Sequence, residues 1–275
     1  MKLVTLLENT RVSEEYKKAH GLSLYIETPK HKILFDTGGN DYFFHNGKKL
    51  GIDLKDVDIA IISHGHSDHG GGLEDFLKIN EKAKIYIGSE AFDKHVVKVL
   101  GVFKYNIGLK QELSNNSRFI KVDGRLKIDE ELILFSDIAG NEFLPKGNKR
   151  LLKEYKGGNI SQDDFKHEIN LLINDKGSYN LLCGCAHRGI VNIVDRGKEL
   201  IKDNIKNVVG GFHLMGTKVK KTEDQDFLNR LADTLTNKDV KNYYTCHCTG
   251  KETYNYLNQR MDNLNEIKTG MTLEL

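Results

Sequence analysis

The sequence predicts an α/β protein in which short buried strands lead through loops into amphipathic helices. One observation is the run 58–62, which is short, apolar and β-branched, as buried strands are. A second is the pattern at 190–202, which places Ile190, Ile193, Val194 and Ile201 on one face of a helix. A third is that histidine-bearing loops follow several strands, at the position where open α/β sheets hold ligands.

The same patterns, taken in chain order, predict the remaining elements. Strands are expected at 3–7, 22–28, 31–35, 58–62, 84–88, 118–122, 132–136, 169–174, 179–183, 208–214, 241–245 and 266–275. Helices are expected at 41–50, 73–80, 89–100, 190–202, 222–236 and from 251 to about Arg260, with a short helical piece that ends at Ala19. Ser89 and Thr222 are the expected N-caps of two of them.

The region 101–158 is the least regular part of the chain and reads as an insertion. It contains a lysine-rich run at 146–156, which is typical of a solvated flap and would also suit an anionic substrate. Proline occurs only 2 times, and no Pro- or Ser-rich linker separates the halves. We therefore expect one domain over residues 1–275.

Composition narrows the class of function. The chain has 275 residues, of which 39% are hydrophobic, enough for a sizeable core. A net charge of +2 from 41 basic and 39 acidic residues gives no indication of a nucleic-acid or membrane partner. The apolar stretch at 1–7 is too short for a signal peptide, and no run is long enough to span a bilayer. We expect a cytoplasmic protein that acts on a small molecule, and its oligomeric state is open.

The segment 63–72 has the highest density of candidate metal ligands in the sequence. Within six positions it holds His64, His66, Asp68 and His69, and glycines at 65 and 70–72 remove side-chain bulk around them. In an extended loop, His64, His66 and Asp68 share one side and His69 opposes them. Imidazoles suit zinc, and the added carboxylate and imidazole suit a second ion.

Three further strand ends carry single histidines, namely His187, His213 and His247. Such a histidine alone is usually structural, but four strand-end loops of this kind indicate one shared metal centre. Asp36, which ends the strand 31–35 before two glycines, is a candidate acceptor that orients a ligating histidine. The other histidines have no such setting and are expected to be surface or packing residues: His20, His31, His45, His95 and His167.

The four cysteines form two Cys-x-Cys pairs, Cys183/Cys185 and Cys246/Cys248. The spacing does not match the two-residue spacer usual in four-thiolate zinc or iron–sulfur sites. Small buried thiols, kept reduced in a cytoplasm, are the simpler interpretation. Because the pairs lie beside His187 and His247, a metal or redox role stays open.

The run His-x-His-x-Asp-His at 64–69 resembles the signature of the metallo-β-lactamase fold superfamily, as do the residues at 36–39 and the single histidines 187 and 247. The segments 19–24, 184–189, 210–214 and 247–250 resemble the narrower branch labelled 7,8-dihydropterin-6-methyl-4-(β-D-ribofuranosyl)aminobenzene-5′-phosphate synthase-like. The resemblance implies a four-layer αβ/βα sandwich, in which two mixed sheets face each other with helices outside.

The resemblance also implies a ligand set. His64, His66 and His187 would bind a first metal, Asp68, His69 and His247 a second, and Asp36 would orient a ligand. Most of the superfamily has a bridging acid at a strand end between the last two histidines, but here that strand ends in Gly211-Phe212-His213. His213 would therefore ligate or contact substrate, and the second metal would bind more weakly.

These residues together predict a metal-dependent hydrolase. One or two zinc ions, with iron or manganese as alternatives, would activate water against an ester or phosphoester bond of a small anionic substrate. Asp68 would hold the second metal or accept a proton, and His213 would donate to the developing charge. The alternatives are a pterin-related synthase that acts on a phosphorylated sugar and a non-catalytic metal-binding or redox protein. A di-iron redox site usually has a glutamate where His66 stands.

Overall fold

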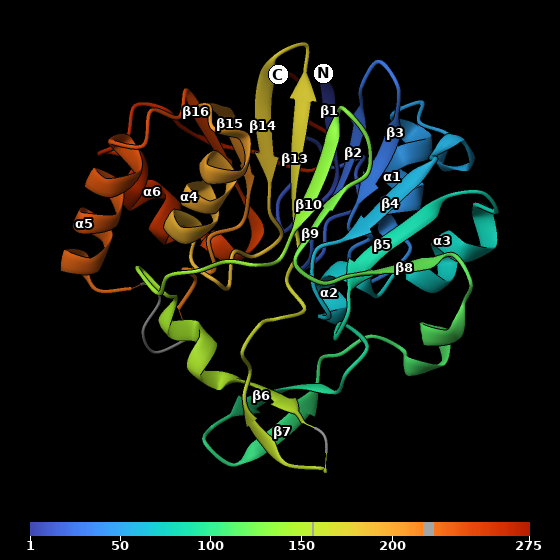
Figure 1. Ribbon diagram of the computed structural model, residues 1–275, viewed down its shortest axis with the longest axis horizontal. Helices are drawn as coiled ribbons and strands as arrows, with labels where there is room; N and C mark the ends of the chain where they lie inside the picture. Colours follow the sequence, from blue (N-terminus) through green and yellow to red (C-terminus); the bar gives the residue numbers. More distant parts are fainter. Residues whose placement is uncertain (156, 217–222) are drawn as a thin grey trace. The chain divides into compact units, whose positions relative to one another are not determined.

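The computed structural model describes residues 1–155, 157–216 and 223–275, and it confirms the predicted α/β class (Figure 1). Lys156 of the lysine-rich run and Thr222, the expected N-cap, lie outside the described residues. The chain divides into two compact units that each draw on separate stretches of sequence. The first unit comprises Met1–Asp123, Lys149–Ile169 and Lys268–Leu275, and the second Gly124–Asn148 and Asn170–Ile267. The expectation of one domain stays a prediction.

The main sheet of the first unit changes from antiparallel to parallel across its width. Its order is β18-β1-β2-β3-β4-β5-β8, and β3, β4, β5 and β8 are parallel neighbours. The strands are β1 (Lys2–Leu7), β2 (Ser23–Glu27), β3 (Lys32–Phe35), β4 (Ile59–Ile62), β5 (Lys84–Gly88), β8 (Phe119–Val122) and β18 (Thr272–Glu274). Because β3 and β4 are parallel, Asp36 and Ser63 leave the sheet at the same edge.

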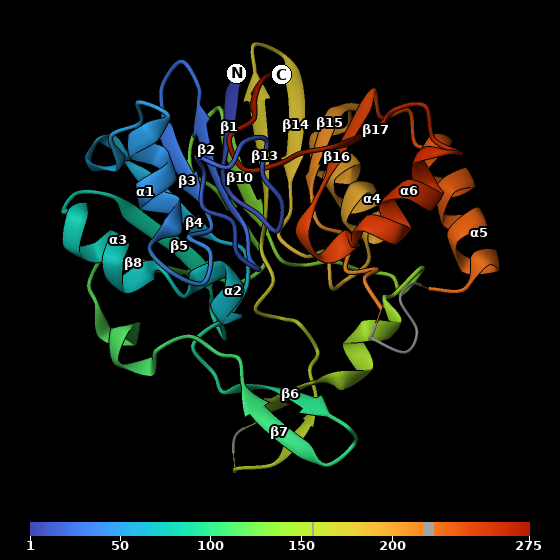
Figure 2. The same cartoon turned by 180° about the vertical axis from the view of Figure 1, so that it is seen from behind.

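Two helices, α1 (Tyr42–Lys49) and α3 (Leu73–Ile79), pack on one face of this sheet (Figure 2). Phe43 and Phe76 enter a core that includes Leu34, Ala60 and Ile62 from the strands. The remaining helical turns of the unit are short: η1 (Leu54–Asp56), α2 (Ser67–Gly70) and η2 (Gln111–Asn115). The short helix expected before Ala19 is absent, since residues 12–16 form bends and turns and residues 17–19 have no regular structure.

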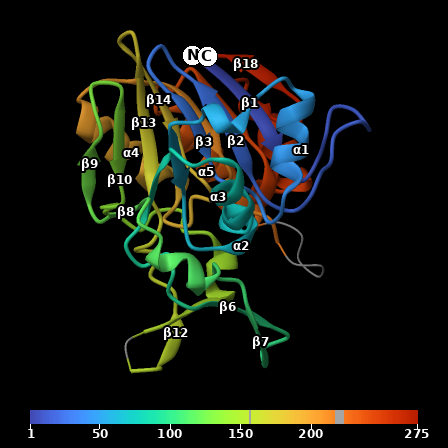
Figure 3. The same cartoon turned by 90° about the vertical axis from the view of Figure 1, so that its right-hand side faces the viewer.

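A second, small antiparallel sheet belongs to the first unit, with the order β12-β11-β6-β7 (Figure 3). Its strands are β6 (His95–Val99), β7 (Phe103–Asn106), β11 (Leu151–Glu154) and β12 (Ile160–Gln162). The expected helix at 89–100 is therefore wrong, because 95–99 pair with β7 and β11 instead. The expected solvated flap is also wrong at Lys153, whose side chain is only 1% exposed and pairs with Glu90 and Asp164.

The second unit is built on one seven-stranded sheet, with the order β17-β16-β15-β14-β13-β10-β9. Its strands are β9 (Arg125–Lys127), β10 (Leu132–Phe135), β13 (Asn170–Asp175), β14 (Ser178–Leu182), β15 (Ile205–Gly210), β16 (Asn242–Thr245) and β17 (Leu264–Glu266). The last four strands in chain order, β14 to β17, are parallel neighbours. Their carboxyl ends consequently share one edge, which is where His187, His213 and His247 follow.

The helices of the second unit are α4 (Ile190–Ile201), α5 (Gln225–Thr236) and α6 (Lys251–Asn258), with the turns η3 (Lys146–Arg150), which crosses the boundary of the units, and η4 (His247–Thr249). Apolar residues of α4, α5 and α6 share one core with Leu181, Val208 and Tyr243 of the sheet. The observed cap of α5 is Asp224, whose side chain accepts from Phe227 N. In the part of the chain that the structure describes, no helix is both long and apolar enough to cross a membrane.

Candidate metal centre

Asp36 anchors the histidine loop of the first unit from the end of β3. Its Oδ1 accepts from the Ser63 amide at 2.7 Å, and its Oδ2 accepts from Ser63 Oγ at 2.8 Å. His69 Nδ1 lies 2.6 Å from the same Oδ2. Asp36, Ser63, His64 and His69 are fully buried. The carboxylate thus ties β3, the end of β4 and the α2 turn together.

These hydrogen bonds assign the tautomers of two imidazoles. A carboxylate oxygen only accepts, so His69 carries its proton on Nδ1. Ser63 Oγ uses its one proton on Asp36, so His64 Nδ1, 2.9 Å from Oγ, must donate to it. In both rings the protein therefore engages Nδ1, and Nε2 is the atom with a lone pair for a metal ion.

The three histidines of the loop are close neighbours. Ring centroids of His64 and His66 lie 4.6 Å apart, and those of His64 and His69 lie 4.2 Å apart. The loop is not extended throughout, because amides of His69 and Gly70 bond back to His66 O and start the α2 turn. The alternation expected for Asp68 and His69 therefore fails after His66. Asp68 Oδ2 instead lies 3.2 Å from Nε2 of the half-exposed His20.

His66 faces a buried cluster that the sequence does not reveal. His66, His95, Asp163 and His167 offer ligand atoms that all lie within 4.8 Å of one another. Burial, together with the nearby imidazoles of His167 and His95, holds the pKa of His66 well below its usual range. His66 is therefore neutral near pH 7, which is the form that binds metal.

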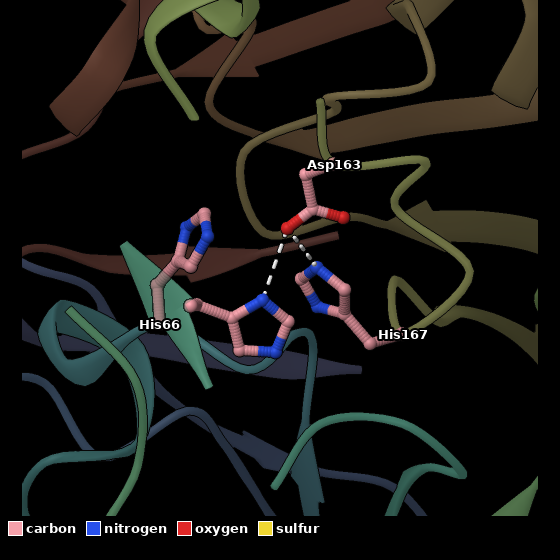
Figure 4. Close-up of side chains that lie close together, drawn as sticks. His66, Asp163 and His167 are labelled. Carbon is pink, nitrogen blue, oxygen red and sulfur yellow. Dashed lines mark hydrogen bonds and ion pairs between the residues drawn. The ribbon is translucent and has the colours of Figure 1, made fainter. Parts of the chain in front are cut away.

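The hydrogen bonds of this cluster give His167 a structural role. Its Nδ1 accepts from the Gly65 amide at 2.9 Å, so its proton lies on Nε2, 3.2 Å from Asp163 Oδ2 (Figure 4). Asp163 Oδ2 also accepts from His95 Nδ1 at 3.0 Å. Both nitrogens of His167 are engaged, and the set holds the backbone between His64 and His66. A Cβ on residue 65 would clash with Ala91 O and lie 2.6 Å from His95 Nε2.

In the second unit, Asn148 accepts a hydrogen bond from Nδ1 of His187, as Asp36 does from Nδ1 of His69. The Asn148 amide donates to His187 O at 2.8 Å, which directs its Oδ1 to His187 Nδ1 at 3.0 Å. His187 therefore donates from Nδ1 and keeps the lone pair on its buried Nε2. The imidazoles of His187 and His213 lie 4.2 Å apart. His213 and His247 both have positive φ, at 50° and 49°, a strained backbone that is common at functional sites.

The donor set fits a metal ion in each unit taken by itself. The first unit brings together His64, His66 and His69, and the second brings together His187, His213 and His247, with Cys185 among them. Neutral imidazoles oriented through Nδ1 are the ligands that zinc-class ions prefer. Which of these residues bind metal stays a prediction.

Sequence reasoning missed four supporting residues: His95, Asp163, His167 and Asn148. His95 and His167 were expected to be surface or packing residues, and they are fully buried partners of one carboxylate. Only the spacing of Asp163 and His167, four residues apart, hinted at a pair. Asn148 lies in the lysine-rich run and carried no signal.

Comparison with known proteins agrees with this fold. The family model described as the metallo-β-lactamase superfamily matches residues 18–144. A crystal structure described as a metal-dependent hydrolase of the β-lactamase superfamily superposes with a TM-score of 0.83 at 28% identity, over 100% of this chain and 99% of the other. The chain is therefore similar, in sequence and in fold, to proteins of the metallo-β-lactamase superfamily.

Two relatives from Methanocaldococcus jannaschii are also similar over nearly the whole chain. An uncharacterized protein is 29% identical over 94% of both chains. A second relative, named 7,8-dihydropterin-6-methyl-4-(β-D-ribofuranosyl)-aminobenzene-5′-phosphate synthase, is 28% identical over 93% of this chain and 90% of its own length. These similarities confirm the predicted resemblance to the superfamily and to its narrower branch.

Proposed function

We propose that this chain is a metal-dependent hydrolase that cleaves an ester or phosphoester bond of a small anionic substrate. The observation that carries the proposal is the Asp36 network, which leaves Nε2 of His64 and of His69 as the metal-facing atoms. Buried histidines with both tautomers set by one carboxylate are characteristic of ligands rather than of core packing.

The ligands in this proposal are those that the resemblance implies. His64, His66 and His187 hold one ion, and Asp68, His69 and His247 hold a second, with zinc as the first choice and iron or manganese as alternatives. A bound zinc ion lowers the pKa of water to about 7 and polarises the oxygen that gains charge. His66 contributes a neutral imidazole, and Asp36, Asn148 and Asp163 keep the ligands oriented.

An anionic substrate is supported by the second unit. The α4 helix begins directly after the His187 loop, and its first-turn amides favour negative charge. Lys149 and Arg150 are exposed in the same segment as Asn148. Lys146 and Lys153 contribute less than the sequence suggests, because they already pair with carboxylates. No nucleic acid or membrane is part of this proposal.

A second candidate function is a pterin-related synthase that acts on a phosphorylated sugar. It is favoured by the whole-length similarity to the relative of that name. The hydrolase and the synthase would both bind the metal, and the anionic group of the substrate, at the same residues. A purely metal-binding or redox protein is the third reading, and it predicts metal without turnover.

The test is the substitution His66→Ala, assayed for bound metal and for hydrolysis of chromogenic esters and phosphodiesters. We expect the metal content to fall and turnover to drop at least about 100-fold, because a lost ligand leaves the water unactivated. His45→Ala is the matched control, since His45 is a partly exposed histidine paired with Asp41. Unchanged turnover in His66→Ala would refute the hydrolase assignment. Metal without turnover on any substrate of the panel would favour the third reading.

A further inference from the structure

In the second unit, the loops at the carboxyl ends of the parallel strands carry cysteines as well as histidines. Cys185 follows β14, His213 follows β15 and Cys248 lies in η4 after β16, so all three leave the same edge of adjacent parallel strands. The Sγ atoms of the two cysteines and a ring nitrogen of His213 lie within 4.8 Å of one another. Side chains 63 residues apart in sequence thus converge on one point.

Cys185 lies at the centre of this convergence. Its Sγ is within 4.8 Å of a ring nitrogen of His187 and, in a separate grouping, of His247. Around a single zinc ion, ligand atoms at bond lengths of about 2.1–2.3 Å lie about 3.5 Å apart. Both Cys185 and Cys248 are buried.

The surroundings of Cys248 suit a sulfur that carries negative charge. The backbone N–H of His213 donates to Cys248 Sγ at 3.2 Å. Amide donors of this kind stabilise a thiolate, which is the metal-binding form of cysteine. Gly211 leaves the space that this sulfur fills, because a Cβ there would overlap Cys248 Sγ.

His213 supplies an independent indication of a ligand. Its Nδ1 is buried and has no hydrogen-bond partner among the described residues. A buried polar nitrogen of this kind is costly unless something binds it. The imidazole is packed on the other side, where Nε2 would lie 3.1 Å from a Cβ on Gly147.

We propose that Cys185, His213 and Cys248 form a thiolate-containing ligand set for a zinc-class divalent ion, with Cys185 Sγ as its central donor. The proposal deepens the proposed function and rests on it for the presence of a metal. The strand end Gly211-Phe212-His213 carries no carboxylate. Two thiolates would supply the negative charge that is missing there. Soft sulfur donors favour zinc or cobalt over manganese or magnesium.

The experiment uses Co²⁺, which reports sulfur ligation by thiolate-to-metal charge-transfer absorption in the near ultraviolet. The full-length protein is stripped of metal, loaded with Co²⁺ under reducing conditions and compared with Cys185→Ser and Cys248→Ser. We expect the band in the parent protein, its loss in Cys185→Ser and a loss of at least half in Cys248→Ser. His213→Ala should keep the sulfur band but weaken Co²⁺ binding about 10-fold.

Cys183→Ser and Cys246→Ser are the matched controls, because they are the other members of the two Cys-x-Cys pairs and are also buried. Cys183 Sγ contacts the backbone carbonyls of Val209 and Gly211, at 3.7 and 3.9 Å. Both controls should keep the band, and thermal unfolding of all variants identifies any that fail to fold. The double variant Cys185→Ser/Cys248→Ser retaining the band would overturn the proposal.

Other outcomes also decide between explanations. A disulfide between Cys185 and Cys248 in protein purified under reducing conditions, detected by intact mass, would overturn the proposal in favour of a redox pair. Hydrolysis is measured on the same samples, so the two ideas can fail separately. A parent protein with turnover but no sulfur band would contradict the thiolate set alone. A band without turnover would contradict the hydrolase and leave the thiolate set standing.

Discussion

At the scale of single residues, buried acceptors decide which nitrogen each imidazole can offer. Asp36 orients His69 directly and His64 through Ser63, and Asn148 orients His187 in the same way. Asp163 acts indirectly. It holds the proton of His167 on Nε2, so that His167 Nδ1 can accept a hydrogen bond from the Gly65 amide. A histidine motif becomes a ligand set only when such acceptors remove the wrong tautomers.

Asp163→Asn should therefore weaken metal binding although Asp163 is not a proposed ligand. An asparagine has only one accepting oxygen, so it cannot accept from His95 and His167, as Oδ2 does, and also from the Phe165 amide, as Oδ1 does. The His64–His66 backbone therefore loosens. We expect metal affinity to fall about 10- to 100-fold, measured by competition with a chromogenic chelator.

The control is Asp164→Asn, because the neighbouring Asp164 pairs with Lys153 and not with the histidines. It removes the same charge and should leave metal affinity within about twofold of the parent protein. Equal losses in both variants would show that charge or global stability, and not the His167 tautomer, is responsible.

At the scale of elements, local patterns predicted most strands and helices and failed where pairing is distant. Residues 95–99 contain three valines, which favours a strand, but Ser89 mimics a helix N-cap. The strand β6 pairs with the adjacent β7 on one side and, on the other, with β11, more than 50 residues further along the chain. No local signal reports a partner at that separation.

Two glycines, one in a loop and one in a helix, should respond oppositely to alanine. Gly65→Ala should destabilise the fold and abolish metal binding, because its Cβ would meet Ala91 O and the His95 ring. Gly47→Ala lies inside α1, where the nearest atom would be 3.7 Å away. It should stabilise the protein by about 0.5–1 kcal/mol through helix propensity. Chemical denaturation measures both, and a neutral Gly65→Ala would contradict the close packing of the loop.

At the scale of the whole molecule, the net charge is small, so overall charge repulsion contributes little to folding stability near neutral pH. The dependence of that stability on pH then comes from particular carboxylates. Hydrogen bonds from Lys110 and Lys78 lower the pKa of Glu74 to about 2. Burial raises the pKa of Asp164, but the hydrogen bond and charge of Lys153, together with those of Lys166, outweigh burial and leave that pKa lowered. A carboxylate whose folded pKa is depressed adds stability above its unfolded pKa and loses that contribution as pH falls through the folded one.

Thermal stability should accordingly change little between about pH 7 and pH 5 and fall steeply from about pH 4 to pH 2. The double variant Glu74→Gln/Asp164→Asn should be less stable near pH 7 and show a shallower fall over the acid window. Added salt should reduce the contribution of Glu74 to folding stability, since the Glu74 side chain is exposed. Parallel pH profiles for the parent and the variant would assign acid unfolding to other groups.

The sequence by itself determined the α/β class, the resemblance to the metallo-β-lactamase superfamily and the residues expected to bind metal. It could do so because strand and helix periodicity is local and because His64, His66, Asp68 and His69 lie within six positions. Only the tertiary structure decided the tautomers, the burial of Lys153, the β6 strand and the meeting of Cys185 with His213 and Cys248. Each of these depends on contacts between distant segments, and a hydrogen bond or a thiol contact leaves no periodicity in the chain.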